Sequence, residues 1–199
     1  KPESPGPSVS KLVPKVQSTA KILYTIYFGM TLIQLALLLI GRVPLFDSLC
    51  ITFGTAGTGG FGIVNDSLGS YSTYCQVVTT IFMILFGVNF SAYYLILTKK
   101  FRQAFKYEEV RYYFGIIAVA IVIIALNTAH LFRNLLTAFQ QAAFQVGSII
   151  TTTGFSSTDF NQWPALSKTV LVLLMFVGAC AGSTGGGIKV SRILILCKA

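Results

Sequence analysis

The residues of this chain with the most suggestive chemistry are three threonines and a glycine in the segment TTTGFS, residues 151–156. The segment has no Lys, His, Cys or carboxylate, so it contains no group that could act as a general acid or base or activate one of its hydroxyls as a nucleophile. Successive backbone carbonyls, with a Thr hydroxyl at the entrance, can instead replace the hydration shell of a cation. Gly154 would let the backbone turn a carbonyl toward a pore axis at low steric cost. The hexapeptide alone is equally compatible with an ordinary polar loop between two helices.

A second segment of the same kind favours the cation-lining interpretation. It is TGGFG at residues 58–62, and its Gly60 lies 94 residues before Gly154. Each segment follows a short apolar stretch and precedes a polar, turn-rich one. Internal repeats carry more weight than single motifs, so the two segments are interpreted together.

The composition indicates an integral membrane protein. Of the 199 residues 54% are hydrophobic and only 11% are charged, with a mean hydropathy of +0.72, whereas soluble domains carry about 25% charged residues. The four cysteines occur singly and there is one histidine, His130, so neither a disulfide framework nor a zinc site is expected. The net charge of +9 does not indicate nucleic acid as a partner, because the basic residues lie at the ends of apolar segments.

Apolar segments of alternating length predict an all-α membrane fold with two tandem helix–pore-helix–helix repeats. Long segments at residues 22–40, 75–98 and 112–129 can each cross a bilayer, which takes about 20 residues. Shorter ones precede each glycine-containing loop, as in re-entrant segments, which are tolerated where they line a water-filled cavity or are buried in protein. The predicted organisation is a polar cytosolic lead-in (1–20), a first repeat (21–98), a basic cytosolic linker (99–111) and a second repeat (112–199).

The basic residues also predict the orientation of the chain in the membrane. Twelve of the fifteen Lys and Arg residues fall on one face, which is therefore cytoplasmic in a multi-pass protein of the cell (plasma or inner) membrane. Both filter-like loops then open to the outside. Three carboxylates, Asp47, Asp66 and Asp159, fall beside them, either to concentrate cations at a pore mouth or simply as parts of solvated loops.

The last apolar segment is interrupted by ACAGSTGGGIK, residues 179–189. Each glycine inside a helix costs roughly 0.8–1 kcal/mol relative to Ala, so the four in residues 182–187 predict a break. A phosphate-binding loop is disfavoured, because Ile188 separates Gly187 from Lys189. A small-residue packing surface is one interpretation; the favoured one is a flexible intramembrane loop that gates the path below the filter. Residues 86–90 (FGVNF), which correspond in the first repeat, are expected to stay largely helical.

At this point the motifs resemble those of the Trk/Ktr/HKT superfamily of potassium transporters, close to the bacterial Trk/Ktr membrane (pore) subunit. The resemblance rests on TTTGFS, the following TDFN and Trp163-Pro164, and AGSTGGGIKVSR at residues 181–192, and it covers the chain after the lead-in. It implies four repeats around one pore, of which this chain looks like the second and third. The family's gating arginine, in the fourth repeat, lies outside this chain.

The resemblance implies a residue set for the filter and the gate. The filter would comprise Thr58, Gly59, Gly60, Phe61, Thr152, Thr153, Gly154 and Phe155. Potassium would be held by the backbone carbonyls of Thr58, Gly59, Gly60, Thr152, Thr153 and Gly154. The gate loop would comprise Gly182, Ser183, Thr184, Gly185, Gly186 and Gly187.

The implied function is uptake of K⁺ through a carbonyl-lined filter, with K⁺ as cargo and no organic cofactor. The alternative is a secondary transporter of another small cation or solute (Na⁺, or a symporter) built on broken helices; breaks that hold only Thr and Gly favour a bare cation. No enzymatic activity is expected. The implied partners are the remaining repeats, a second copy in a homodimer, and a cytosolic nucleotide-binding (RCK-type) regulatory subunit; linker 99–111 suits such a subunit or anionic lipid of the bilayer equally well.

Overall fold

The computed structural model describes residues 16–100 and 107–198, and the helices dominate this part of the chain. The predicted all-α class is therefore confirmed, whereas the lead-in up to residue 15 and residues 101–106 of the linker lie outside the described residues. The first half contains α1 (Val16–Ile40), α2 (Leu45–Ala56), α3 (Thr73–Phe86) and α4 (Phe90–Leu97). The second half contains α6 (Glu108–Thr128), α7 (Leu135–Ile150), α8 (Ala165–Phe176) and α9 (Val190–Lys198), with 3-10 turns at Ala129–Leu131 and Phe160–Gln162.

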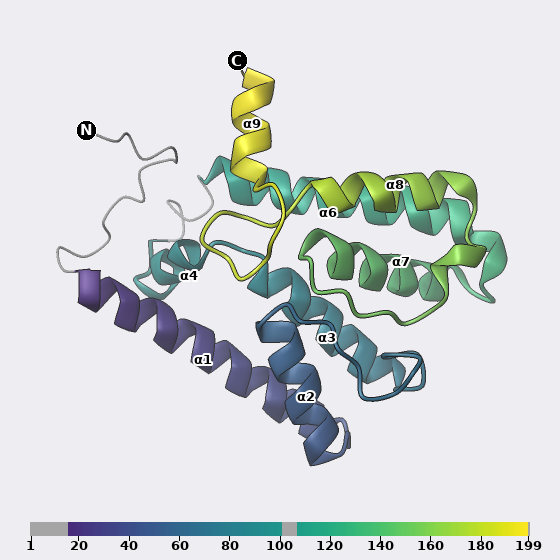
Figure 1. The fold of residues 1–199 in the computed structure, drawn as a ribbon, viewed down its shortest axis with the longest axis horizontal. Coiled ribbons are helices and arrows are strands. Elements are labelled where there is room, and N and C mark those ends of the chain that lie inside the picture. The colour runs from purple at the N-terminus through teal and green to yellow at the C-terminus, as the bar shows by residue number, and fades with distance from the viewer. Residues whose placement is uncertain (1–15, 101–106, 199) are drawn as a thin grey trace.

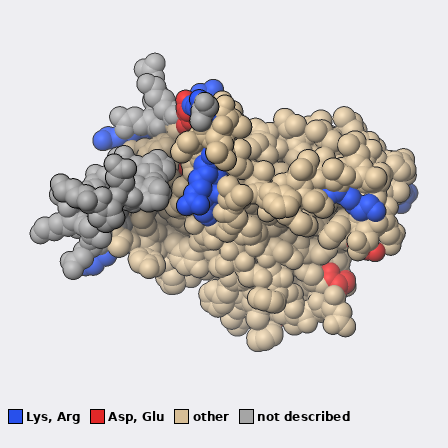
Figure 2. All heavy atoms as spheres, turned by 45° about the horizontal axis from the view of Figure 1, so that its top comes forward, with Lys and Arg blue, Asp and Glu red and all other residues tan. Residues whose placement is uncertain are grey.

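Two of the described helices are long and apolar enough to cross a membrane. They are Ala20–Ile40, with a mean hydropathy of 1.9, and Glu108–Leu131, with 2.3. Helices α3 and α4 make a third span if the bent pair is counted as one, and α2, α7 and α8 are apolar but shorter. The surface is accordingly dominated by uncharged residues, with Lys, Arg, Asp and Glu at a few separate positions (Figure 2). This is the length pattern of a multi-pass protein with half-length helices.

The two halves repeat the same order of elements (Figure 1). In each half a long helix, α1 or α6, is followed by a half-length helix, α2 or α7, which leads into a glycine-containing loop. A helical segment that breaks in two then completes the unit: α3 and α4 in the first half, α8 and α9 in the second. The structure thus contains the predicted helix–pore-helix–helix arrangement twice.

The halves share their hydrophobic cores rather than standing apart. Phe144 and Phe155 of the second half lie in the core of the first, among buried side chains of α1, α2 and α3. Val88 and Ala92 of the first half lie in the core of the second. Helix α3 also packs directly on α7. Because each half completes the other, the loops at their boundary have a fixed position.

The break between α3 and α4 contradicts the expectation that residues 86–90 stay largely helical. Helix α3 ends at Phe86, α4 begins at Phe90, and the two meet at an angle of 94°. The Asn89 side chain accepts a hydrogen bond from the Ser91 N–H at 2.8 Å, which caps the new helix. The break predicted in the last segment is confirmed, since residues 177–189 separate α8 from α9.

Candidate functional site

The two filter-like segments, residues 58–61 and 152–155 (the two strands), share the same pattern of backbone φ. Thr58 and Gly60 have φ of +52° and +68°, and Thr152 and Gly154 have φ of +58° and +91°. The residue between each pair does not have a positive φ. Alternation of this kind points successive carbonyls to one side of the strand, whereas a β-strand points them alternately to opposite sides. The left-handed region costs a non-glycine residue roughly 1–2 kcal/mol, so both threonines are held there by their surroundings.

The end of each half-length helix fixes this conformation through equivalent hydrogen bonds. The carbonyl of Gly54, two residues before the end of α2, accepts from the N–H groups of the second and third strand residues at 2.7 and 3.5 Å. The carbonyl of Ser148, two residues before the end of α7, does the same for its strand at 2.9 and 3.2 Å. The two strands are therefore structural repeats, 94 residues apart, as the sequence predicts.

Six backbone carbonyls remain without a hydrogen-bond donor among the described residues. They belong to Thr58, Gly59, Gly60, Thr152, Thr153 and Gly154, the six carbonyls predicted to hold the cation. In the second segment the flanking carbonyls are occupied: that of Thr151 accepts from the Thr152 hydroxyl at 2.7 Å, and that of Phe155 from the Ser148 hydroxyl at 2.5 Å. In the first segment the Gly57 carbonyl accepts from the Thr58 hydroxyl at 2.8 Å, whereas the Phe61 carbonyl has no donor among the described residues. Consecutive carbonyls without a donor are available to coordinate a cation.

The strands lie against one another but are not equivalent in their surroundings. A Cβ atom on Gly60 would lie 1.9 Å from the Thr153 carbonyl oxygen, whereas one on Gly154 would have no neighbour within 4 Å. Phe155 is 1% exposed and packs on Gly54 of the first repeat. Its counterpart Phe61 is 85% exposed. The structure thus brings together the predicted strand residues except Phe61, whose side chain is not covered by the described residues.

The glycine loop lies against the first residue of both strands. The Thr58 hydroxyl is shared between the Gly57 carbonyl at 2.8 Å and the Thr184 carbonyl at 3.2 Å, and the Gly186 N–H donates to the Thr152 hydroxyl at 2.7 Å. A Cβ on Gly185 would be 3.0 Å from the Thr151 carbonyl oxygen. The loop also leads into α9, which carries basic residues of the predicted cytoplasmic face. It therefore lies at the end of the strands that the predicted orientation directs toward the cytoplasm.

The break between α3 and α4 receives this loop, an arrangement that the sequence analysis missed. Four hydrogen bonds join the two: Cys180 N–H to the Gly87 carbonyl (3.0 Å), Phe90 N–H to the Gly182 carbonyl (3.0 Å), and both the N–H (3.3 Å) and the hydroxyl (3.2 Å) of Thr184 to the Phe86 carbonyl. Irregular backbone at membrane depth needs such internal partners. The break between α3 and α4 and the break between α8 and α9 thus provide hydrogen-bond partners for each other's backbone groups.

A polar network behind the strands was also missed, although glutamines in otherwise apolar helices are a signal for it. The Gln76 side chain donates to the Leu68 carbonyl at 3.0 Å and accepts from two glutamines of α7, Gln140 and Gln141, at 3.0 and 3.1 Å. The Leu68 N–H in turn donates to the Ser156 carbonyl at 2.8 Å. The network connects the outer ends of both loops to α3 and α7.

The three outer carboxylates all have local partners. Asp47 accepts from the Tyr71 hydroxyl at 2.7 Å, and burial together with this hydrogen bond raises the pKa of Tyr71 well above its usual range. Asp66 accepts from the Ser70 hydroxyl. The Asn161 N–H, at 3.0 Å, and then the Gln162 amide lower the pKa of Asp159. Within the described ranges no group of three or more His, Cys, Asp and Glu residues could hold a metal ion.

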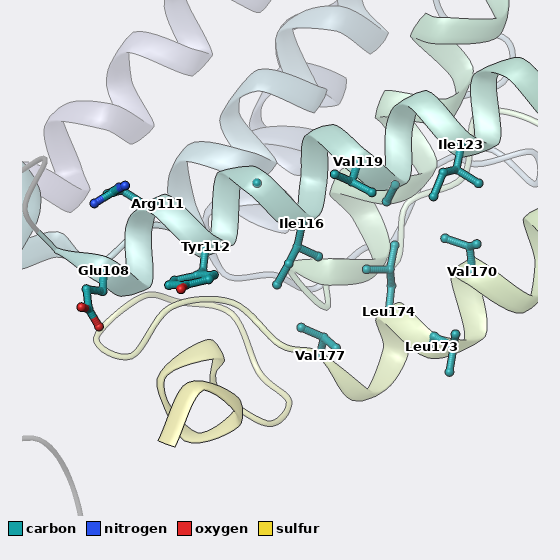
Figure 3. A pocket seen from close by; sticks show the side chains of 12 residues that line it. Glu108, Arg111, Tyr112, Ile116, Val119, Ile123, Val170, Leu173, Leu174 and Val177 are labelled. Atoms are coloured by element: carbon teal, nitrogen blue, oxygen red, sulfur yellow. The ribbon is translucent and has the colours of Figure 1, made fainter. Parts of the chain in front are cut away.

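An open groove of about 660 Å³ lies between α6 and α8 on the flank of the second repeat (Figure 3). Its walls are mainly aliphatic, with Glu108, Arg111 and Tyr112 at one end. No residue of the two strands or of positions 182–187 lines it. The groove is therefore separate from the candidate site.

Comparisons with known proteins identify the family of this chain. A family model described as TrkH, cation transport protein, matches residues 6–199. The chain belongs to the TrkH family. It is 34% identical to the Trk system potassium uptake protein TrkH of Salmonella typhimurium, over 98% of this chain and 42% of the relative. It is 30% identical to TrkG of Escherichia coli, over 98% of this chain and 41% of the relative.

The fold of the TrkH family is found in the structure as well. The crystal structure of the potassium transporter TrkH from Vibrio parahaemolyticus matches with a TM-score of 0.87 and 31% identity, over 95% of this chain and 42% of that one. The chain thus spans less than half the length of these relatives. The predicted resemblance to the Trk/Ktr membrane subunit is confirmed, and the protein is an integral membrane protein of a transporter family.

Proposed function

We propose that this chain forms part of a pore for K⁺ uptake across the cell (plasma or inner) membrane. The observation that carries the proposal is the pair of strands with matching backbone, each presenting three carbonyls without a donor. Carbonyl oxygens in such a ring replace the hydration shell of K⁺. The relatives are named potassium uptake proteins, which favours K⁺ over the alternative of Na⁺ or a solute symporter.

The glycine loop acts as the gate of this pore. Its Thr184 carbonyl and Gly186 N–H bind the hydroxyls of Thr58 and Thr152, the innermost groups of the two strands. An ion that leaves the filter toward the cytoplasm meets the loop at this point. In this proposal the loop blocks the pore when it lies against the two threonines, and conduction requires the loop to move away from them.

Two strands supply half of a four-sided filter, and the remaining repeats of a longer protein would supply the rest. Phe155 covers Gly54 of the repeat before it. By the same geometry the exposed Phe61 would cover the half-length helix of a preceding repeat, and a following repeat would fill the open space beside Gly154. A homodimer and a cytosolic nucleotide-binding regulatory subunit complete the proposed assembly.

The test is K⁺ uptake by transport-deficient cells that express the full-length protein with Gly154→Ser, or with residues 182–187 deleted. Gly154→Ser should reduce uptake or the preference for K⁺ over Na⁺, because φ of +91° disfavours a side chain. The deletion should raise K⁺ flux. Gly29→Ala is the matched control, since a Cβ at this α1 glycine meets no atom within 4 Å. Unchanged uptake and selectivity in both variants would refute the pore.

A further inference from the structure

One carboxylate oxygen holds both ends of the glycine loop. Glu109 lies in the first turn of α6, and its Oε1 accepts a hydrogen bond from the Ala181 N–H at 2.7 Å and another from the Ser191 N–H at 3.2 Å. Ala181 directly precedes residues 182–187, and Ser191 is the second residue of α9. The two donors are ten residues apart in the chain. Glu109 thus joins the two ends of the loop, which backbone hydrogen bonds also connect, from the Gly178 N–H to the Ile188 carbonyl at 2.8 Å and from the Val190 N–H to the Ala179 carbonyl at 3.4 Å.

Three properties of these groups strengthen the two hydrogen bonds to Glu109. The first N–H groups of a helix have no acceptor within it, so Ser191 depends on a side chain at this point. The helix dipole also favours a negative charge at the start of α9. Hydrogen bonds to an ionised carboxylate are roughly twice as strong as those between neutral groups. Glu109 is half-buried, so water competes less for the oxygen than at an exposed site.

We propose that Glu109 is a positioning residue of the gate: its charge holds the loop against Thr58 and Thr152 and so sets the fraction of time that the pore is blocked. This inference rests on the proposed function of the loop as a gate. With the base of the loop tied, the segment between Ala181 and Ser191 can reach the two strand threonines. Without the Glu109 carboxylate, the N–H groups of Ala181 and Ser191 lose their acceptor and the loop ends keep only their backbone hydrogen bonds. The contacts of the loop with the two threonines then lose part of their support.

The neighbouring carboxylate provides an internal comparison. Glu108, in the same turn of α6, pairs with Lys198 at the other end of α9, and both side chains are more than half exposed. Figure 3 shows Glu108 at the start of α6. Exposed ion pairs contribute little, and Glu108 makes no hydrogen bond to the loop among the described residues. The two glutamates thus lie in the same turn of α6 and have the same side chain, but only Glu109 forms hydrogen bonds with the ends of the glycine loop.

The experiment measures K⁺ flux through the full-length protein in proteoliposomes, normalised to folded protein, together with the K⁺/Na⁺ preference. Glu109→Ala should raise K⁺ flux several-fold and leave the ion preference unchanged, because the filter strands are not altered. Glu109→Gln keeps an acceptor without the charge and should give an intermediate increase. Glu109→Asp should stay nearest to the unchanged protein. Glu108→Gln is the matched control and should leave flux unchanged.

Loop variants distinguish failure of this inference from failure of the gate. Deletion of residues 182–187 raises flux if the loop blocks the pore, and Glu109→Ala should then have no further effect in the deletion background. If that deletion does not fold, Gly185→Ala serves instead, since its Cβ would lie 2.5 Å from that of Ala179 and displace the loop. Raised flux in the loop variants but not in Glu109→Ala overturns the positioning role alone. Unchanged flux in the loop variants overturns the gate and, with it, this inference. Lower thermal stability without raised flux would show that Glu109 merely caps α9.

Discussion

Gly87, in the first repeat, lies in close contact with side chains of the second repeat. A double substitution can measure the free energy of this contact. A Cβ at Gly87 would lie 2.2 Å from the Tyr113 hydroxyl oxygen and 2.9 Å from Cγ2 of Thr151. Tyr113 is fully buried on α6, and its hydroxyl donates to the Ile84 carbonyl at 3.0 Å. Gly87→Ala should therefore force the tyrosine hydroxyl out of its position.

The magnitude follows from two terms. Overpacking by one methyl group costs about 1–3 kcal/mol, and loss of the tyrosine hydrogen bond adds about 1 kcal/mol. Gly87→Ala should thus lower the free energy of unfolding by about 2–4 kcal/mol. Tyr113→Phe alone should cost only about 1 kcal/mol, since the Ile84 carbonyl keeps the Gly87 N–H at 3.2 Å as a donor.

The two substitutions together should be less harmful than Gly87→Ala alone. Removal of the hydroxyl oxygen leaves ring carbon Cζ of Tyr113, at 3.0 Å, as the nearest tyrosine atom to the new methyl group. Tyr113→Phe should accordingly destabilise the unchanged protein and stabilise the Gly87→Ala variant. Thermal unfolding of the four purified proteins in detergent measures this reversal of sign. If Tyr113→Phe had the same effect in both backgrounds, the close contact inferred from the structure would be wrong.

Three further predictions concern the strands and the outer surface. Ser148→Ala should lower K⁺/Na⁺ selectivity and cost about 1–3 kcal/mol, because the Phe155 carbonyl loses its 2.5 Å donor; unchanged permeability ratios would contradict this. Phe61→Ala should destabilise the full-length protein by about 3–5 kcal/mol, the cost for a buried phenylalanine, because a further repeat is proposed to cover this side chain. A negligible change in the unfolding temperature would show that no repeat covers it. Asp159→Asn should remove a stabilisation that is complete above the ordinary aspartate pKa of 3.8 and is lost as the pH falls through the lower pKa of the folded state. Acid unfolding curves of the two proteins should therefore converge at the lowest pH and diverge toward neutral pH.

The sequence predicts those features that depend on local composition. Runs of apolar residues indicate the long helices, and the glycines at positions 60 and 154 mark where the backbone takes positive φ. The positive φ of Thr58 and Thr152 has no such signal, because it is imposed by the helix ends and by contacts with the loop.

The features that the sequence did not predict depend on partners far away in the chain. A single glycine at position 87 costs a helix only about 1 kcal/mol, so the break at that point follows from hydrogen bonds to a loop more than 90 residues later. Glu109 was likewise assigned to a basic linker by its charged neighbours. Its role depends on donors 72 and 82 residues away, and no local pattern indicates them.

In the proposed gating mechanism, the mutual pairing of the two helix breaks couples movement of the glycine loop to the entry of water. When the loop leaves, the carbonyls of Phe86 and Gly87 lose their donors together. A buried group left unpaired costs about 1–3 kcal/mol, so a dry open state would carry several such costs at once. Water must enter as the loop departs, and this water also rehydrates an ion that leaves the filter. Osmolytes too large to enter the pore should therefore favour its closed state. A K⁺ flux that is insensitive to such osmolytes would show that loop movement does not require the entry of water.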